Sequence, residues 1–264
     1  MTKKILAILL LFSLALHLYL ANIKQAIPPQ KGEQINPPSH WNEDNPSRFR
    51  VSTYNIRRGK GDDGIRDIRR TATNLFNADI IALNELAGAW DGSNQAQQLG
   101  NILDMGWLFA PTQRRWYRDY YGNGFLSRFF VKTWTIRPLL YAGRHRNLVT
   151  TQLQINDHSV YILTTHLDIG GVQEDQLSYV IDQFRHYKSA ILMGDLNTNS
   201  DNLQLRQLFD SGDAKDAINL ALGESAPKKR KDWIITRGFK VIEGGFMERG
   251  ISDHPCFWVE LERL

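Results

Sequence analysis

The chain begins with a continuous apolar run, and beyond residue 48 short apolar runs alternate with segments of helical spacing. Short apolar runs that end at turn residues are typical of buried strands. We predict seven strands, at residues 49–56, 79–86, 148–155, 160–167, 190–196, 233–236 and 256–261.

Three segments place apolar residues on one face of a helix, at intervals of three and four positions. We therefore predict three helices, whose apolar faces are Ile65, Ile68, Ala72, Leu75 and Phe76; Leu177, Val180, Ile181 and Phe184; and Leu203, Leu205 and Leu208.

Asn156-Asp157-His158 lies between two alternating segments and predicts a tight turn. A tight turn joins antiparallel strands, so we do not expect a purely parallel sheet. Mixed sheets with helices outside, packed around one core, are the economical arrangement for the domain of about 215 residues.

The apolar run covers residues 5–21, interrupted by Ser13, His17 and Tyr19. Its 17 residues lie at the border between signal-peptide cores, of about 7 to 15 residues, and spanning helices, of about 17 to 25. Ala21 stands two residues after Tyr19, a poor match to a small-x-small cleavage site. We expect residues 1–24 to be an uncleaved anchor, with a cleaved signal segment as the alternative.

Lys3 and Lys4 precede this run and favour an N-terminus on the inner side of the membrane. The folded domain is then anchored or exported to the periplasmic or extracellular side. Residues 25–47 contain five of the nine prolines and no apolar periodicity, which indicates an extended, semi-rigid tether. We expect one domain over residues 48–264.

The composition, 42% hydrophobic and 11% aromatic, is sufficient for a packed core. The net charge of +4 falls to +1 once the three lysines before residue 25 are set aside, so total charge gives no argument for nucleic acid. Cys256 is the only cysteine in the sequence, which excludes an intrachain disulfide and a zinc ribbon. A single thiol is compatible with the cytosol and with an exported protein, so the cysteine content does not select a redox compartment.

Polar side chains close several of the predicted strands. Asp195 and Asn197 stand two residues apart, which places them on one face of an extended strand, although the same residues are also favoured in turns. Glu85 ends an apolar run and can supply an oxygen ligand to Mg²⁺. Asn55 has the same placement. Taken singly, each is as easily explained as an ordinary strand end.

Two histidines stand beside similar segments. His254 follows Asp253 directly, so that the pair can divide metal binding and proton transfer, and an unperturbed imidazole titrates near neutral pH. Asp232 can accept a hydrogen bond from an imidazole and fix its tautomer, or be an ordinary surface charge. His166 is the second candidate, although a lone histidine is more often structural.

In their order along the chain, these sites resemble the deoxyribonuclease-I-like endonuclease/exonuclease/phosphatase superfamily. The resemblance runs from about residue 48 to the C-terminus, through Tyr54-Asn55-Ile56, Asn84-Glu85, Tyr121-Gly122-Asn123-Gly124, Arg146, Thr165-His166-Leu167, Gly194-Asp195-Leu196-Asn197, Asp232-Trp233-Ile234 and Ser252-Asp253-His254-Pro255. It implies a four-layered sandwich of the α/β (α+β) class, in which two mixed β-sheets pack face to face with helices outside.

The resemblance also implies roles in a divalent-metal-dependent phosphoester hydrolase. Its metal ion, usually Mg²⁺ with Mn²⁺ as an alternative, is bound by Glu85, with Asn55 and Asp253 close to the same coordination sphere. His254 is the general base and Asp232 orients it. The remaining implied roles are alignment of the water by Asp195, stabilisation of the transition state by Asn197 and His166, and supporting phosphate contacts by Arg146 and Asn123.

The sequence departs from the family pattern at a few places. Asn84 stands where the family usually has Gln. Thr198 replaces the Arg expected of inositol-polyphosphate 5-phosphatases, and Lys231-Asp232 lacks the Arg-Leu-Asp pattern of abasic-site endonucleases, so both subfamilies are disfavoured.

The resemblance implies a phosphodiester substrate, with nucleic acid among the candidates, and three interpretations remain. An exported or anchored nuclease or related phosphodiesterase is favoured, a sphingomyelinase-type lipid phosphodiesterase is the alternative, and a non-catalytic phosphate-binding module is disfavoured by the complete set of site residues. We expect a monomer that contacts the membrane through its N-terminal segment. Four basic clusters can touch a polyanion: Arg57-Arg58-Gly59-Lys60, Arg114-Arg115-Trp116-Tyr117-Arg118, Arg144 with Arg146, and Lys228-Lys229-Arg230-Lys231.

Overall fold

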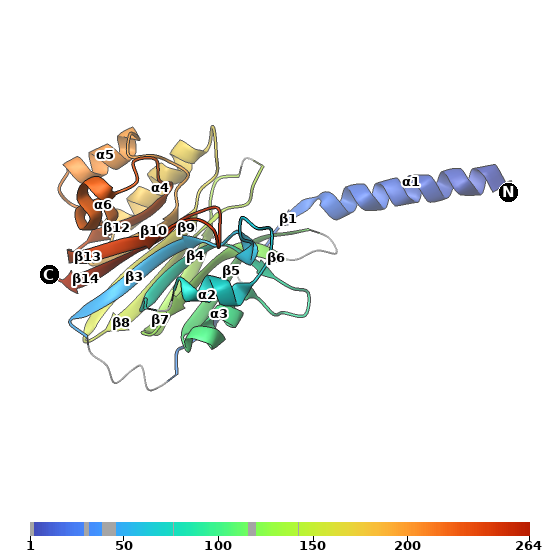
Figure 1. Cartoon of the computed structure of the whole chain (residues 1–264). Helices are drawn as coiled ribbons and strands as arrows, with labels where there is room; N and C mark the ends of the chain where they lie inside the picture. The colour runs from blue at the N-terminus through green and yellow to red at the C-terminus, as the bar shows by residue number, and fades with distance from the viewer. Residues whose placement is uncertain (1–2, 29–31, 39–45, 76, 116–119, 142) are drawn as a thin grey trace.

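A computed structural model describes residues 3–28, 32–38, 46–75, 77–115, 120–141 and 143–264. Two sheets form the centre of the domain (Figure 1). The first has the order β1-β5-β6-β4-β3-β14-β13, with β2 also paired to β5, and the second has the order β11-β12-β10-β9-β8-β7.

The strands of the first sheet are β1 (Lys24–Ala26), β2 (Glu33–Ile35), β3 (Arg48–Asn55), β4 (Ile80–Gly88), β5 (Gly106–Arg115), β6 (Tyr120–Ser127), β13 (Phe239–Met247) and β14 (Cys256–Arg263). Those of the second are β7 (Phe130–Pro138), β8 (Asn147–Ile155), β9 (His158–His166), β10 (Ala190–Asp195), β11 (Lys215–Asp216) and β12 (Asp232–Arg237). All seven predicted strands are therefore present, and the turn after Ile155 joins β8 to β9 in an antiparallel hairpin.

The helices are α1 (Lys3–Asn22), α2 (Ile68–Thr73), α3 (Gln95–Leu103), α4 (Gln173–Arg185), α5 (Leu203–Asp210) and α6 (Ala217–Leu222), with short 3₁₀ turns η3 (Arg57–Gly59) and η4 (Gly223–Ser225). Helices α2 and α3 pack on the outer face of the first sheet, and α4 and α5 on that of the second. The structure thus confirms the predicted four-layered sandwich, with two mixed sheets inside (Figure 1).

The layers follow from the period-two alternation of the strands. In β3, Phe49 and Val51 face the second sheet, whereas Tyr54 faces the helices. In β10, Ile191 lies between the sheets and Leu192 faces α4 and α5. A central apolar core and two outer cores result.

Two predicted helix faces are partly wrong. Asp67 caps α2 by accepting hydrogen bonds from the backbone N–H groups of Arg69 and Arg70, so the helix starts after Ile65, which is 59% exposed. Leu203, the first residue of α5, is exposed for the same reason, because Asn202 is the N-cap. Phe76 lies outside the described residues. The apolar face of α4 is confirmed.

The predicted tether is not free in its described parts. Gln25 pairs with Arg114 and Gln34 with Leu108, so that β1 and β2 are added to the edge strand β5. Ile27 is buried against the domain. Backbone pairing with an open sheet edge satisfies the N–H and C=O groups that a proline-rich segment would otherwise expose to water.

A β-bulge near the end of β4 redirects the chain. Ala82 and Asn84 follow the alternation toward the second sheet, but the pairing with β6 shifts register between Leu83 and Leu86. The extra residue, Glu85, has a φ of 60°, in the left-handed region. Without the bulge, alternation would point the Glu85 carboxylate into the apolar core beneath α2 and α3.

Gly194 packs against the neighbouring strand at a distance that no other residue allows. Its φ is 136°, and a Cβ there would lie 1.9 Å from the carbonyl oxygen of Thr165. We expect Gly194→Ala to lose about 3 kcal/mol or more of unfolding free energy, because the backbone beside Asp195 must move. Thermal unfolding followed by circular dichroism measures the loss.

Gly171→Ala is the matched control, since a Cβ at Gly171 meets nothing within 4 Å. Equal melting temperatures for the two variants would contradict the close approach at Gly194.

Candidate active site

The inward-facing polar side chains gather at one end of both sheets, where the central apolar core stops. Strand alternation carries them there: Ile191 and Asp195 share a face, as do Ile162 and His166. The set is buried and comes from seven strands: Asn55, Asn84, Asn123, Asn147, His166, Asp195 and Asp232.

Asn84 connects the two sheets. Its side-chain oxygen accepts a 2.9 Å hydrogen bond from the backbone N–H of Asp195, and its Nδ2 donates to the Thr165 carbonyl at 3.1 Å. The same Nδ2 donates to Asn123 Oδ1 at 2.9 Å, and Asn123 in turn donates to Asn147 Oδ1 at 2.8 Å. This chain of amides fixes the position of Asp195 relative to the first sheet.

Asp195 is surrounded by hydrogen-bond donors. Asn55 donates from Nδ2 to Asp195 Oδ2 at 3.1 Å, and the backbone N–H of Asn197 donates to Oδ1 at 3.0 Å. The Nε2 of His166 lies 3.4 Å from Oδ2. Groups from both sheets therefore fix the orientation of the Asp195 carboxylate.

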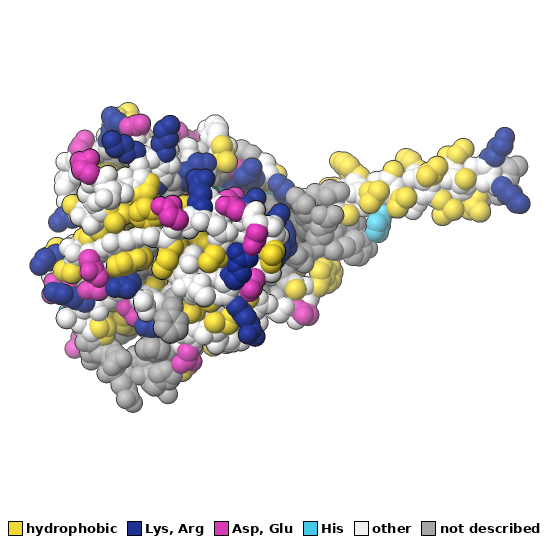
Figure 2. Space-filling view, viewed as in Figure 1, with side chains coloured by type: hydrophobic (Ala, Val, Ile, Leu, Met, Phe, Trp, Pro, Cys, Tyr) yellow, Lys and Arg dark blue, Asp and Glu magenta, His cyan; other side chains and the backbone are white. Residues whose placement is uncertain are grey.

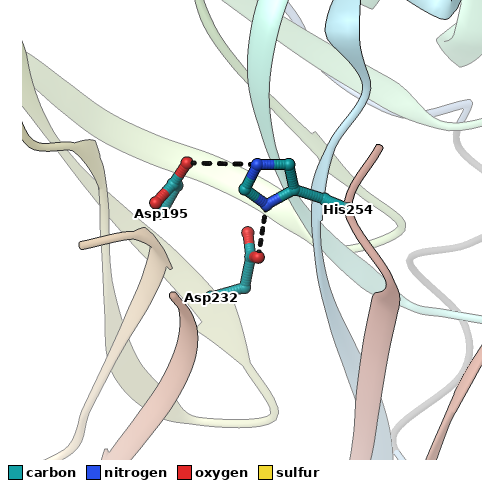
Figure 3. A group of neighbouring side chains, drawn as sticks. All are labelled: Asp195, Asp232 and His254. Atoms are coloured by element: carbon teal, nitrogen blue, oxygen red, sulfur yellow. Dashed lines mark hydrogen bonds and ion pairs between the residues drawn. The ribbon is translucent and has the colours of Figure 1, made fainter. Parts of the chain in front are cut away.

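His254 lies between two aspartates, as Figure 3 shows. Its Nδ1 lies 2.7 Å from Asp232 Oδ2, and its Nε2 lies 3.8 Å from Asp195 Oδ2. An ionised carboxylate only accepts, so Nδ1 donates to Asp232. The longer distance is no hydrogen bond, and it leaves Nε2 facing Asp195 without a direct hydrogen bond to it.

The charges around these rings shift their pKa values in opposite directions. Burial lowers the pKa of His254, but the hydrogen bond and charge of Asp232, together with the charge of Asp195, raise it to about 9. Burial and the charge of Arg146 hold the pKa of His166 well below its usual value. Burial and Asp232 raise the pKa of Asp195. His166 is thus neutral, whereas His254 is protonated at neutral pH in the metal-free site.

Glu85 is beside the same end of the first sheet. Asn55 and Asn84 are register partners on parallel strands, so Glu85 lies next to Asn55 across the sheet. The phenol of Tyr121 hydrogen bonds to both Glu85 and Arg146, and burial with the Glu85 charge raises the pKa of Tyr121. The tyrosine therefore positions the carboxylate.

Asp253 is held near Asn55 by a hydrogen bond of the preceding residue, Ser252. Ser252 Oγ donates to the Asn55 carbonyl at 2.6 Å, which holds the loop before β14 against the end of β3. The Asp253 carboxylate itself lies 3.4 Å from Nε of Arg57. Asn55, Glu85 and Asp253 are thus neighbours through backbone pairing and this loop contact.

One set of side chains has its ligand atoms close enough together to hold a divalent cation, and a second set is a candidate from the sequence. One is Asp195, Asp232 and His254, whose ligand atoms all lie within 4.8 Å of one another, and in which the buried Asp232 Oδ1 has no hydrogen-bond partner among the described residues. A cation there competes with the proton between His254 and Asp232. The other is Glu85 with Asn55 and Asp253, whose carboxylate and amide oxygens suit Mg²⁺.

Two cavities flank the site. A cavity of about 330 Å³ opens beside Glu85 and Tyr121 and is lined by arginines and lysines, among them Arg58 and Arg146. A second cavity, of about 560 Å³, lies on the other side, beside His254 and Asp232.

The relation between Asp195 and Asn197 differs from the predicted one. Strand β10 ends at Asp195, and Asn197 has a φ of 51°, so the pair does not share the face of an extended strand. Asp195 instead closes a turn by accepting from the Asn197 N–H, while Asn197 Nδ2 donates to the Leu167 carbonyl at 2.9 Å. The turn interpretation is correct here.

Arg146 and Asn123 have different surroundings. Arg146 is 4% exposed and lines the basic cavity, whereas Asn123 is buried within the amide chain, away from either cavity's described lining.

Sequence reasoning missed Asn147, which ends the chain of amides that starts at Asn84, and gave no separate role to Tyr121. A polar residue at the first position of an apolar strand was the available signal for Asn147.

The predicted basic clusters are distributed over both cavities. The first lines the smaller cavity with Arg57, Arg58 and Lys60, and Arg144 and Arg146 join it there. Of the second cluster, Trp116, Tyr117 and Arg118 lie outside the described residues. The residues of the last cluster differ in their surroundings.

Lys229 and Lys231 line the larger cavity. Arg230 also borders it but has a structural partner, because its guanidinium pairs with Asp216 and lies over the Trp233 ring, 4.2 Å from the centroid. The Arg230 guanidinium therefore makes its main contacts within the protein.

These features define a class: deoxyribonuclease-I-like proteins, in which two mixed sheets carry a His–Asp pair and a strand-end glutamate at one end. Residues 52–254 match the Endonuclease/Exonuclease/phosphatase family, and the chain belongs to that family. Its members are in general hydrolases of phosphoester bonds that use a divalent metal.

Solved structures share the fold. An endonuclease/exonuclease/phosphatase from Beutenbergia cavernae matches with a TM-score of 0.65 and 21% identity, over 82% of this chain and 72% of that one. A humanized D. rerio TDP2 matches with a TM-score of 0.63 and 20% identity, over 82% and 100%. A functionally unknown conserved protein from Enterococcus faecalis matches with a TM-score of 0.66 and 16% identity, over 82% of this chain and 100% of that one. No curated protein matches the sequence.

The contact between Asp232 and His254 can be tested by titration. We expect Asp232→Asn to lower the pKa of His254 from about 9, because the neutral amide no longer stabilises the imidazolium. NMR titration of the His254 ring in metal-free protein measures the shift. Asp201→Asn, which removes an exposed carboxylate, is the control. An unchanged His254 titration in Asp232→Asn would contradict the pairing.

Proposed function

We propose that the protein is a divalent-metal-dependent phosphodiester hydrolase in which His254 activates the attacking water. The observation that carries this proposal is the line of side chains from Asp232 through His254 to Asp195. In it, Nδ1 is held by one carboxylate while Nε2 faces another across a gap. A general base needs this orientation, with one ring nitrogen fixed and the other open.

The chain's own groups divide the remaining work. Asp232 holds the tautomer of His254 and stabilises the ring once it has taken a proton. Asp195 aligns the water, since hydrogen bonds from Asn55 and Asn197 fix its carboxylate. Asn197 and the neutral His166 stabilise charge that grows on the phosphoryl oxygens.

Glu85, Asn55 and Asp253 are the proposed metal ligands, with Mg²⁺ as the ion and Mn²⁺ as a substitute. With a divalent cation held by these residues, the phosphoryl group would be polarised and its negative charge offset. The positive field of such a cation would oppose the charges of Asp232 and Asp195 that raise the pKa of His254, and would favour the neutral ring that a general base requires. This assignment keeps the Asp232–His254 hydrogen bond intact, unlike a cation bound among Asp195, Asp232 and His254.

The nuclease and the lipid phosphodiesterase use the same chemistry and differ in what surrounds the phosphorus. Cavities lie beside Glu85 and beside His254, and both substrates remain in the proposal. A phosphate-binding module without catalysis is disfavoured, since the ordered base, its aspartate and the strained Glu85 serve no need of simple binding.

Removal of the base tests the mechanism. We expect His254→Ala to lose about 10²- to 10⁴-fold in turnover while the protein stays folded. The measurement is hydrolysis of bis(4-nitrophenyl) phosphate, plasmid DNA, RNA and sphingomyelin with Mg²⁺ or Mn²⁺. His186→Ala, at the C-terminal cap of α4, is the control. Near-normal turnover by His254→Ala would refute its role as base.

Metal binding is tested separately from turnover. We expect Glu85→Gln to weaken Mn²⁺ binding by about tenfold or more, because a charged ligand becomes a neutral amide. Isothermal titration calorimetry with MnCl₂ measures it, and Glu224→Gln, in η4, is the control. If Glu85→Gln binds Mn²⁺ like the unchanged protein, the ion is not held at Glu85.

A further inference from the structure

The apolar helix α1 joins the domain at the catalytic end of the sheets. Residues 3–21 are long and apolar enough to cross a membrane, and none of that segment is buried within the protein. Figure 2 shows apolar side chains along α1, up to the basic ones near its free end. Helix α1 ends at Asn22, and β1 begins at Lys24.

Strand β1 fixes where the helix leaves the domain. Lys24 pairs with Arg115 at the end of β5, and the next strand, β6, begins at Tyr120 beside Tyr121. Lys24 lines the same cavity as Glu85 and Tyr121. A two-residue step along a strand covers about 7 Å, so a helix that spans the bilayer holds this cavity close to the membrane surface.

The cavity beside Glu85 has a large excess of positive charge. Seven lysines and arginines line it, against one carboxylate among its described lining residues. Asp62 and Asp253 pair with Arg57, and Asp168 lies 3.8 Å from Arg144. Even with these three acids counted, cations predominate. One scissile phosphodiester carries a single negative charge, so the cavity suits a substrate with a further phosphate.

The loops at this end also expose large apolar side chains. They follow β3, β4 and β9 or precede β8, and each therefore lies at the catalytic end. The exposed fractions are 59% for Ile65, 63% for Trp90, 57% for Leu140, 55% for Tyr141 and 60% for Ile169. Tyr141 stacks on His145, which hydrogen bonds to the backbone of Lys24, so this loop is joined to the segment that leads to α1.

We propose that the substrate is an anionic phospholipid of the membrane in which the protein is anchored, with a second phosphate beyond the scissile one. This inference rests on the proposed phosphodiester hydrolysis. The basic cavity, with Lys24, binds the second phosphate, and exposed side chains such as Leu140 and Tyr141 enter the interface. A nucleic acid would use the same cations but gives no reason for the apolar rim.

The reaction is a balanced hydrolysis. The oxygen of water bonds to phosphorus, and the ester bond from phosphorus to one alcohol oxygen breaks. His254 takes the proton from the water, and the displaced alcohol gains a proton. The products are an alcohol and a phosphomonoester, and no oxidant or further reactant is required.

The test uses the full chain reconstituted in vesicles with Mg²⁺, and ³¹P NMR detects the phosphomonoester. Vesicles contain either cardiolipin, which has two phosphodiesters, or phosphatidylcholine. We expect cardiolipin to be hydrolysed about tenfold faster or more, since a charge-assisted contact to a second phosphate is worth that much. Lys24→Gln should lower cardiolipin turnover by about fivefold.

The apolar rim is tested with a matched pair of variants. Leu140→Ser/Tyr141→Ser should lower the ratio of vesicle turnover to bis(4-nitrophenyl) phosphate turnover by about tenfold, because the interface contact is lost. Phe130→Ser removes an apolar side chain, 45% exposed, at the opposite end of the neighbouring strand β7, and should leave both rates unchanged.

Each outcome has one meaning. Hydrolysis of plasmid DNA without hydrolysis of either lipid overturns the membrane substrate and leaves the proposed function standing. Equal rates on the two lipids overturn the role of the second phosphate. If bis(4-nitrophenyl) phosphate, DNA and lipids all remain intact, the proposed function fails with this inference.

Discussion

The candidate active site depends on the hydrogen bonds that join the two sheets, chiefly those of Asn84, together with the bonds from Asn55 to Asp195 and from Asn123 to Asn147. Asn55, Glu85 and the loop that carries His254 belong to the first sheet, while His166, Asp195 and Asp232 belong to the second. Asn84 accepts from the Asp195 backbone and donates to Asn123 and the Thr165 carbonyl, all between buried groups. Because an unpaired buried amide costs about 1 to 3 kcal/mol, sliding of one sheet on the other is opposed where the reacting groups meet.

Strain is concentrated around these hydrogen bonds. Glu85, Asn197, Arg57 and Arg58 all have positive φ, between 48° and 60°. Such conformations cost roughly 1 to 3 kcal/mol each and persist when neighbouring contacts fix them. Here those contacts are specific: Asn197 is held by Asp195 and Leu167, and the Arg58 carbonyl accepts from Gln95. Three of the four, Glu85, Arg57 and Arg58, line the basic cavity.

The apolar layers also explain why the polar groups are at one end. Between the sheets, facing residues such as Val51, Ile162 and Ile191 close the core completely. Polar residues on the same faces are tolerated only where each finds partners, as the amides and carboxylates do beyond the last apolar layer. The N-terminal segment is added at that end too, through the edge of β5, so that the apolar helix α1, the basic cavity and the candidate site are neighbours.

The sequence alone determined the seven core strands, because period-two alternation is a local signal, while the sandwich and the candidate site residues followed from its resemblance to the family. It also determined which residues resemble the family's reacting groups. It could not determine that Glu85 sits in a bulge, that Asn197 closes a turn on Asp195, or that Asn147 completes the amide chain, since each depends on pairing between distant strands. Strands such as β5 and β7 were missed because glycine, proline and charged residues obscure their alternation. The tertiary structure alone decided that the proline-rich segment pairs with an open sheet edge and brings Lys24 beside Glu85.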